Sequence, residues 1–244
     1  MRPILFCWRG RKIHSYPAML WLGMVAGVVA GNAAAHAAGL NAFRVYVATL
    51  LLILPALAGA RLLHVALHWP LYRANPRRIW DRSDGGAAQY GGLVAVPLSV
   101  PLLAALGVPL GAFWDVATVT ILVGMILTRV GCLLHGCCAG RASEAWCSVL
   151  LPDHAGVWAK RIPTQCFEAL WAALLLAAAV AVWPRLPFPG ALFLVVVIGY
   201  ASGRLVLESL RERRPGAARF SAYHGFSVAL VLVSLAALTA RWPK

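Results

Sequence analysis

Residues 112–135 read AFWDVATVTILVGMILTRVGCLLH. A helix rises 1.5 Å per residue, so about 20 mainly apolar residues are needed to cross the hydrocarbon core of a bilayer. This stretch is long enough and carries few charges, one of which is Arg129. It therefore predicts a transmembrane helix that holds an arginine.

Six further stretches have the same character, and each is closed off by proline, glycine or a basic cluster. These additional predicted spans are residues 17–38, 45–67, 91–110, 165–183, 190–210 and 220–240. The sequence thus predicts an all-α polytopic integral membrane protein with about seven transmembrane helices, in a single membrane domain over residues 1–244. The longest connections, 69–90 and 138–164, predict a small extramembrane cap.

The composition favours a membrane as the main solvent of this fold. Hydrophobic residues make up 61% of the chain and charged residues 12%, about half the charged content of an ordinary soluble domain. Lys and Arg number 22 against 8 Asp and Glu, an excess that marks contact with nucleic acid or anionic membranes. Because the chain is so apolar, we expect a membrane and no nucleic acid as its partner.

The first span has an alternative interpretation as a cleaved signal peptide. Basic residues precede it, and the small-residue run at 32–38 is similar to a signal-peptidase site. The apolar run is long for a signal peptide, so we favour a retained span.

Three arginines fall inside predicted spans: Arg61, Arg129 and Arg204. A charge near the bilayer centre costs at least ~2.5 kcal/mol and needs a partner or a wet cavity. Arg204, Glu208 and Arg211 share one helix face. The planar guanidinium suits bidentate capture of phosphate, so Arg129 and Arg204 predict a phospholipid-headgroup site. Snorkelling or structural ion pairing remains the alternative, above all for Arg61 and Arg211.

The segment TRVGCLLHGCCAGR at 128–141 resembles the signature of the bacterial prolipoprotein diacylglyceryl transferase family, roughly G-R-x-G-N-F-x-N-x-E-x-x-G-R. The matching residues are Arg129, Gly131, Gly140 and Arg141. Other family-like pieces follow in the same order along the chain: Tyr16, GARL at 59–62, GGL at 91–93, Asp115, PTQCFE at 163–168 and the run from Gly199 through Arg204 and Glu208 to Arg211.

The resemblance implies a transferase of the bacterial inner membrane. Such an enzyme moves the diacylglyceryl group of phosphatidylglycerol onto the lipobox cysteine thiol of a prolipoprotein and releases glycerol 1-phosphate. Its implied partners are phosphatidylglycerol, the signal-peptide segment of the prolipoprotein and the membrane. No cofactor and no metal are expected.

The resemblance also implies roles for individual residues. Arg129 and Arg204 would be the essential arginines, with Glu208 orienting Arg204. The implied substrate-binding set also contains Tyr16, Arg61, Gly91, Gly92, Gly131, Cys132, Gly140 and Arg141. Gly91 and Gly92 would let the backbone approach the lipid closely.

Several polar residues of the family are replaced here. Tyr90 stands where the family has a histidine, Cys132 and His135 replace two asparagines, and Cys137 replaces an acidic residue. If the histidine helps to deprotonate the incoming thiol, this chain needs another base, and Tyr90 and His135 are the candidates. An ordinary tyrosine, with a pKa near 10, would more readily donate a hydrogen bond.

The cluster of Cys132, His135, Cys137 and Cys138 leaves three interpretations open. The cysteines are small packing residues, one is a reactive thiolate near Arg129, or the group binds a metal. The single compact run, without two C-x2-C pairs, favours packing. A non-catalytic lipid-binding or metal-handling protein on the same scaffold is the alternative function.

Membrane orientation is predicted in opposite senses by two signals. The tail before the first span holds four basic residues, and the loops after spans two, four and six hold four, three and four more. The other face holds four basic residues. The positive-inside rule places the first face in the cytoplasm. The family places its N-terminus and catalytic side outside, and we favour the family orientation.

Overall fold

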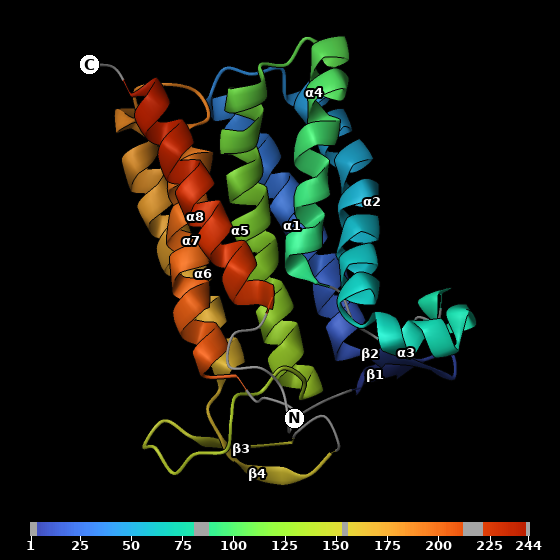
Figure 1. The fold of residues 1–244 in the computed structure, drawn as a ribbon. Helices are drawn as coiled ribbons and strands as arrows, with labels where there is room; N and C mark the ends of the chain where they lie inside the picture. Colours follow the sequence, from blue (N-terminus) through green and yellow to red (C-terminus); the bar gives the residue numbers. More distant parts are fainter. Residues whose placement is uncertain (1–3, 81–87, 153–155, 212–221, 243–244) are drawn as a thin grey trace. The chain divides into compact units, whose positions relative to one another are not determined.

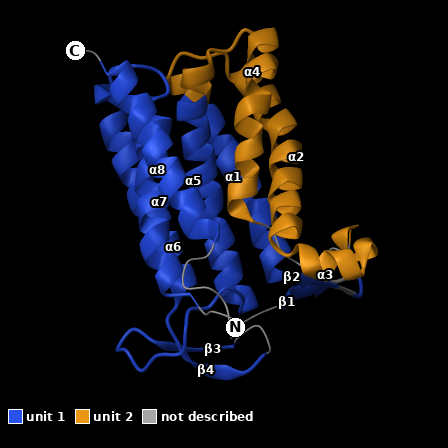
Figure 2. Cartoon of the chain, in the orientation of Figure 1, with its two compact units in different colours: residues 1–34, 114–244 blue, residues 35–113 orange. Residues whose placement is uncertain are grey.

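The structure, a computed structural model, describes residues 4–80, 88–152, 156–211 and 222–242. Contacts within the chain define two compact units, one formed by residues 1–34 and 114–244 and the other by residues 35–113 (Figure 2). Whether both belong to one membrane domain stays a prediction.

Seven helices are long and apolar enough to cross a membrane (Figure 1). They are α1 (Ser15–Ala37), α2 (Ala42–Leu67), η2 with α4 (Gln89–Leu106), α5 (Leu110–His135), α6 with η3 (Thr164–Arg185), α7 (Ala191–Ser209) and α8 (Ala222–Arg241). The predicted all-α class and the seven spans are confirmed, with ends that differ by a few residues. Positions 220 and 221 of the last predicted span lie outside the described residues.

The largest shift of a helix end concerns the third span, which was predicted to run to residue 110 and ends at Leu106. α4 (Ala95–Leu106) ends earlier because Gly107 adopts a left-handed conformation, with φ of 63°, as its C-cap. Such a cap satisfies the last helical carbonyls and stops the helix. α5 then begins at Leu110.

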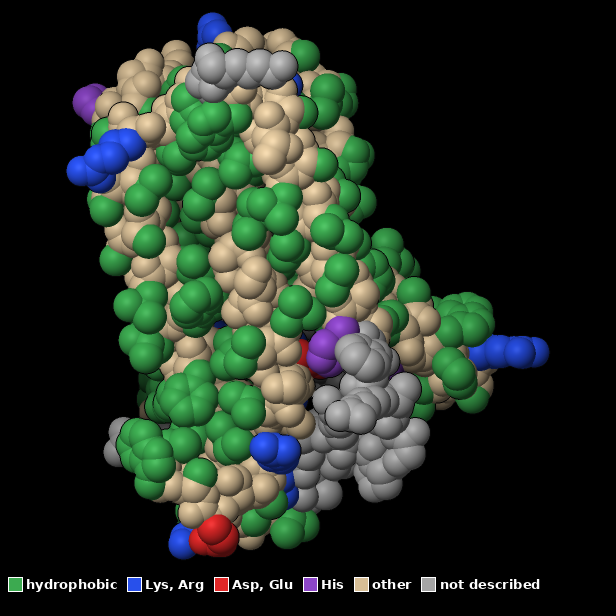
Figure 3. Space-filling view, turned by 60° about the vertical axis from the view of Figure 1, so that its left-hand side comes forward, with side chains coloured by type: hydrophobic (Ala, Val, Ile, Leu, Met, Phe, Trp, Pro, Cys, Tyr) green, Lys and Arg blue, Asp and Glu red, His purple; other side chains and the backbone are tan. Residues whose placement is uncertain are grey.

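The sides of the helices carry large hydrophobic side chains exposed to the surroundings. Leu54 is 71% exposed and Val29 65%, and hydrophobic side chains cover the sides of the helices on the face shown in Figure 3. In water such a continuous apolar surface would drive association. It fits contact with lipid, so the chain is a multi-pass membrane protein.

In the first unit, α1 and α5 approach each other closely through small residues. A Cβ placed on Gly27 would lie 2.5 Å from the carbonyl oxygen of Thr120. Small residues permit this close backbone approach between membrane helices, where dispersion contacts take over from the hydrophobic effect.

α5 is also tied to α7 through a buried carboxylate. Asp115 accepts hydrogen bonds from the backbone N–H groups of Gly190 (2.7 Å) and Phe193 (3.1 Å) at the start of α7. These N–H groups have no partner within the helix, and a negative charge there also complements the helix dipole. α7 packs in turn against α6 and α8, so α5, α6 and α7 form one frame.

Two short antiparallel hairpins lie outside the spans in this unit. β1 (Ile4–Trp8) pairs with β2 (Arg11–His14), and β3 (Val149–Pro152) pairs with β4 (Trp158–Arg161). The second hairpin belongs to the loop between α5 and α6 (Figure 1). The predicted small extramembrane cap is therefore confirmed.

The second unit contains α2, η2 and α4, with the short α3 (Trp69–Ala74) and η1 (Pro76–Trp80). Gly91 touches α2 closely, since a Cβ there would lie 2.2 Å from the carbonyl oxygen of Gly59. Gly91 is thus explained by helix packing. At Gly92 the nearest atom to such a Cβ is 3.7 Å away, so no packing constraint applies there.

Candidate active site

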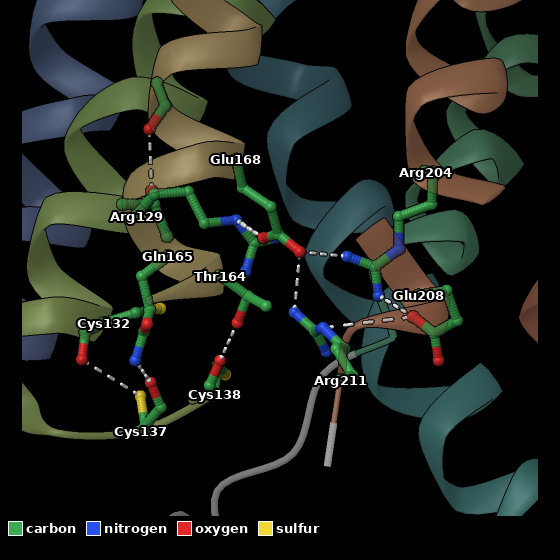
Figure 4. Close-up of polar contacts among 12 residues, drawn as sticks. Arg129, Cys132, Cys137, Cys138, Thr164, Gln165, Glu168, Arg204, Glu208 and Arg211 are labelled. Atoms are coloured by element: carbon green, nitrogen blue, oxygen red, sulfur yellow. Dashed lines mark hydrogen bonds and ion pairs between the residues drawn. The ribbon is translucent and has the colours of Figure 1, made fainter. Parts of the chain in front are cut away.

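Glu168 is the centre of an ionic network within the first unit (Figure 4). Its side chain is 4% exposed and lies in the second turn of α6. Oε2 lies 2.5 Å from Nε of Arg129 on α5, and Oε1 lies 2.5 Å from Nη1 of Arg204 on α7. Nη2 of Arg211 lies 3.0 Å from the same Oε1. One carboxylate thus gathers three arginines.

Glu208 closes the network on α7. It accepts a hydrogen bond from Nη2 of Arg204 at 2.6 Å, one helical turn away, and Nε of Arg211 lies 3.9 Å from the same oxygen. The predicted role of Glu208 in orienting Arg204 agrees with this contact. Arg204 is held by two carboxylates at once, which fixes the plane of its guanidinium.

Among the residues that the structure describes, three arginines and two glutamates give this network one excess positive charge. Arg129, Arg204 and Glu168 are at most 12% exposed in their side chains, so water screens them little. A buried excess charge is costly unless an anion compensates it. The network is therefore suited to bind an anionic group.

The network lies near one end of its helices. Arg129 is six residues from the end of α5, Glu168 four residues after the start of α6, and Arg204 five residues from the end of α7. At 1.5 Å per residue these positions are about 6–9 Å inside the spans. An anion of a lipid headgroup would lie within reach at this depth.

The loop after α5 is folded back onto the start of α6. Gly136 and Cys138 have positive φ values of 83° and 63°, and the N–H of Cys137 donates to the carbonyl of Cys132 at 3.1 Å. Thr164 donates to the carbonyl of Cys138 at 2.8 Å, and Gln165 donates to that of Cys137 at 2.6 Å. The two cysteine carbonyls are thus fixed by buried side chains.

This turn brings together Cys132, Cys137 and Cys138, whose Sγ atoms lie within 4.8 Å of one another. Cys132 is buried and Cys138 is exposed. The pKa of the Cys138 thiol lies well below its ordinary value, because it is hydrogen-bonded to the other two thiols and has Arg211 and Arg129 nearby. The three cysteines are free thiols.

Gly140 and Arg141 continue the loop beside the network. Gly140 donates to the carbonyl of Ile162, and the backbone N–H of Arg141 donates to that of Leu210. A Cβ on Gly140 would lie 2.7 Å and 2.8 Å from these two carbonyl oxygens. Gly140 is therefore needed for packing, and the Arg141 side chain is exposed.

His135 and Tyr16 form a separate group at the end of α5. Their ring centroids are 6.3 Å apart, and His14 lies 6.4 Å from His135. Gly131 lets α1 approach, since a Cβ there would lie 2.7 Å from the Cβ of Met19. His135 is exposed, and its role in handling a proton stays a prediction.

The remaining predicted residues belong to the second unit. Arg61 donates to the carbonyls of Ile79 at 3.1 Å and Arg78 at 3.0 Å, and its guanidinium lies 5.5 Å from the ring centroid of Tyr72. Tyr90 is 8% exposed. The structure accounts for Arg61 by these contacts within its unit. Its contact with substrate, and that of Tyr90, stay predictions.

Sequence reasoning gave no site role to Glu168, Thr164 or Gln165. All three are almost fully buried polar residues at the start of a membrane helix. Glu168 is a carboxylate inside a predicted span, and this is the same kind of signal as the arginines, because placing an ionised group in lipid costs free energy.

The helices and this network define a multi-pass membrane protein with a buried arginine–glutamate network. The chain belongs to the family described as prolipoprotein diacylglyceryl transferase, which it matches over residues 3–240.

Three curated relatives illustrate the similarity, and each is called phosphatidylglycerol–prolipoprotein diacylglyceryl transferase. The protein of Dehalococcoides mccartyi is 30% identical over 214 residues, covering 86% of this chain and 82% of the relative. That of Clostridium tetani is 27% identical over 225 residues, 86% of each chain. That of Streptococcus pyogenes is 29% identical over 207 residues, covering 82% of this chain and 79% of the relative.

Proposed function

We propose that this protein transfers the diacylglyceryl group of phosphatidylglycerol to the cysteine thiol of a prolipoprotein and releases glycerol 1-phosphate. Its family and the names of its relatives support this activity. The observation in the structure that carries the proposal is the convergence of Arg129, Arg204 and Arg211 on Glu168. The reaction would take place in a bacterial inner membrane.

The arginines would act on the leaving group. The thiol sulfur attacks the diacylglyceryl carbon that bears the phosphate ester, a C–S bond forms, and the C–O bond breaks with its electron pair on the phosphate. The phosphate changes from a diester to a monoester and gains negative charge. Donors fixed before the reaction stabilise such developing charge without reorganisation, and Glu168 and Glu208 would fix the guanidinium groups of Arg129 and Arg204.

The excess positive charge of the network would stabilise the transition state more than the bound lipid. A phosphodiester carries one negative charge and matches the network as it stands. The monoester that leaves carries more charge, so the interaction with the arginines is stronger in the transition state than with the bound lipid. Only such differential binding accelerates the chemical step.

The other predicted residues would position the two substrates. Tyr16, Gly131, Cys132, Gly140 and Arg141 belong to the same unit as the network. Arg61, Tyr90, Gly91 and Gly92 belong to the other unit. We propose that the residues of the first unit contact the lipid or the signal-peptide segment. Contacts of Arg61, Gly91 and Gly92 with substrate stay predictions. The thiol proton would be handled by His135 or Tyr90.

A transfer assay tests the proposal. The full chain in detergent or nanodiscs is mixed with labelled phosphatidylglycerol and a lipobox peptide, and the peptide's gain of one diacylglyceryl group is measured by mass. A peptide with serine in place of cysteine is the control. Formation of the thioether-linked product supports the proposal, and its absence, with a related transferase active under the same conditions, contradicts it.

A further inference from the structure

The three clustered thiols of Cys132, Cys137 and Cys138 have a geometry that suits a metal ion. Their sulfur atoms lie within 4.8 Å of one another. A zinc ion bonds to sulfur at about 2.3 Å, which places ligand sulfurs about 3.8 Å apart in a tetrahedral site. Small side-chain rotations would therefore close the cluster around an ion.

The backbone that carries these thiols is already fixed. Thr164 and Gln165 hold the carbonyls of Cys138 and Cys137, and both side chains are almost completely buried. Cys138 keeps a left-handed conformation, with φ of 63°, that a residue with a side chain adopts only when its surroundings require it. The loop therefore holds the three thiols in place without a bound ion.

A second observation points to a ligand at this place. Oε1 of Gln165 is buried and has no hydrogen-bond partner within the described part of the chain. Its amide lies beside the cluster, because Nε2 donates to the carbonyl of Cys137 at 2.6 Å (Figure 4). A buried carbonyl oxygen without a donor is costly. A thiol or water bound at the cluster would supply the missing donor.

The charges favour a divalent ion. A divalent ion with three thiolates carries one net negative charge. The positively charged Arg129 lies one helical turn before Cys132 on α5. A monovalent ion such as Cu(I) would leave two negative charges. Zinc is the thiophilic divalent ion that proteins use most often with cysteine ligands.

The number of protein ligands indicates the role of the fourth coordination position of a zinc ion at this cluster. Among the residues that the structure describes, the cluster contains three cysteines and no fourth His, Cys, Asp or Glu. Structural zinc sites are closed by four protein ligands, whereas catalytic ones have three and leave a position open. The acceptor in the proposed reaction is a cysteine thiol. A thiol is a good zinc ligand, so it could bind at this open position.

We propose that Cys132, Cys137 and Cys138 bind a zinc ion whose open position takes the acceptor thiol of the prolipoprotein. This inference rests on the proposed function. With the ion present, water takes the proton of the bound thiol in place of His135 or Tyr90, and the thiol becomes a zinc thiolate. Its sulfur then forms the bond to the diacylglyceryl carbon as the C–O bond breaks and the electron pair passes to the phosphate. The product is a neutral thioether, a weaker ligand, and leaves the ion.

A metal that deprotonates its thiol ligand removes the need for a strong base in the proposed reaction.

Metal content is the first measurement. The full chain is purified without chelators, and zinc is determined by mass spectrometry for the wild type, the triple variant Cys132→Ser, Cys137→Ser, Cys138→Ser, and the control Cys7→Ser, Cys147→Ser outside the cluster. We expect one zinc per chain in the wild type and control, and little or no zinc in the triple variant, because it lacks all three ligands. Absence of zinc from the wild type, or equal binding by the triple variant, overturns the proposal.

Binding of the peptide's thiol is measured on the wild type with cobalt in place of zinc. This measurement does not depend on the folding of a variant. The expected result is a thiolate-to-cobalt absorption band that shifts when the lipobox peptide is added and does not shift with the serine peptide. An unchanged spectrum overturns the assignment of the open position to the acceptor.

Transfer activity separates this inference from the proposed function. Chelation of the wild type should slow transfer by about tenfold or more, and zinc should restore it. Full activity of the metal-free chain overturns the zinc proposal and leaves the transferase intact. If the chain binds zinc and the peptide's thiol yet transfers nothing, the transferase assignment fails, and with it the catalytic role of the ion.

Discussion

Nε of Arg129 and Oε2 of Glu168 lie 2.5 Å apart and join α5 to α6 through a buried ion pair. The same carboxylate holds Arg204 on α7. Glu168 is therefore both the counter-charge that lets the arginines be buried and the group that aims them. Its removal should affect stability and catalysis together.

We expect Glu168→Gln to be the most damaging conservative change in the protein. Gln keeps the shape but leaves three arginines without their shared carboxylate. Breaking a buried ion pair by removing one partner costs about 3–5 kcal/mol. Thermal unfolding in detergent should show a clear loss of stability, whereas Glu144→Gln, in the exposed pair with Lys160, should change it little. Equal stability of the two variants would contradict the central position of Glu168.

Glu208→Gln should have a smaller and more specific effect. Arg204 would keep its contact with Glu168 and lose the second carboxylate that fixes its plane. We expect kcat to fall by about tenfold, in the range of lost positioning interactions, with the KM for phosphatidylglycerol nearly unchanged. In a double-mutant cycle with Arg204→Lys the two effects should not add. Strict additivity would show that Glu208 does not act through Arg204.

Asp115 should matter for stability and not for the reaction itself. Its carboxylate accepts from two N–H groups at the start of α7, and loss of a helix cap costs about 0.5–2 kcal/mol. Asp115→Ala should lower the melting temperature while the folded fraction keeps its kcat. A loss of kcat in fully folded protein would place Asp115 in the site, against this prediction.

Close packing of α1 on α5 gives a fourth prediction. A side chain on Gly27 would collide with the backbone of Thr120, and overpacking of a tight interface costs about 1–3 kcal/mol or more. Gly27→Val should reduce the yield of folded protein. Gly225→Val is the matched control, because a Cβ at Gly225 meets nothing within 4 Å. Equal yields would contradict the close contact.

The spans could be predicted from sequence because hydrophobic length alone decides them, as in residues 112–135. The early end of α4 could not, since it depends on the left-handed conformation of Gly107. The arginines were found because charges are rare in lipid. Glu168 was missed because its importance depends on segments that are distant in sequence and meet around it only in the folded protein.

The cysteine cluster shows the same limit. Sequence spacing places Cys132 near the end of a helix and Cys137 just beyond it, which is compatible with packing as well as with ligation. The positive φ values of Gly136 and Cys138 turn the chain back toward Cys132. A positive φ is usual for a glycine that directly follows a helix, as Gly136 does, but the positive φ of Cys138 does not follow from its residue type.

The role of the arginines in the reaction is tested most directly by comparing Arg204→Lys with wild type in nanodiscs that contain phosphatidylglycerol. Arg185→Lys, an exposed arginine at the other end of α6, is the control. Single-turnover transfer to the lipobox peptide should slow by about 100-fold or more in Arg204→Lys, the effect of losing one fixed donor to a developing anion, and not in the control. Transfer by folded Arg204→Lys at the wild-type rate would contradict the assignment of the arginine–glutamate network to the leaving phosphate.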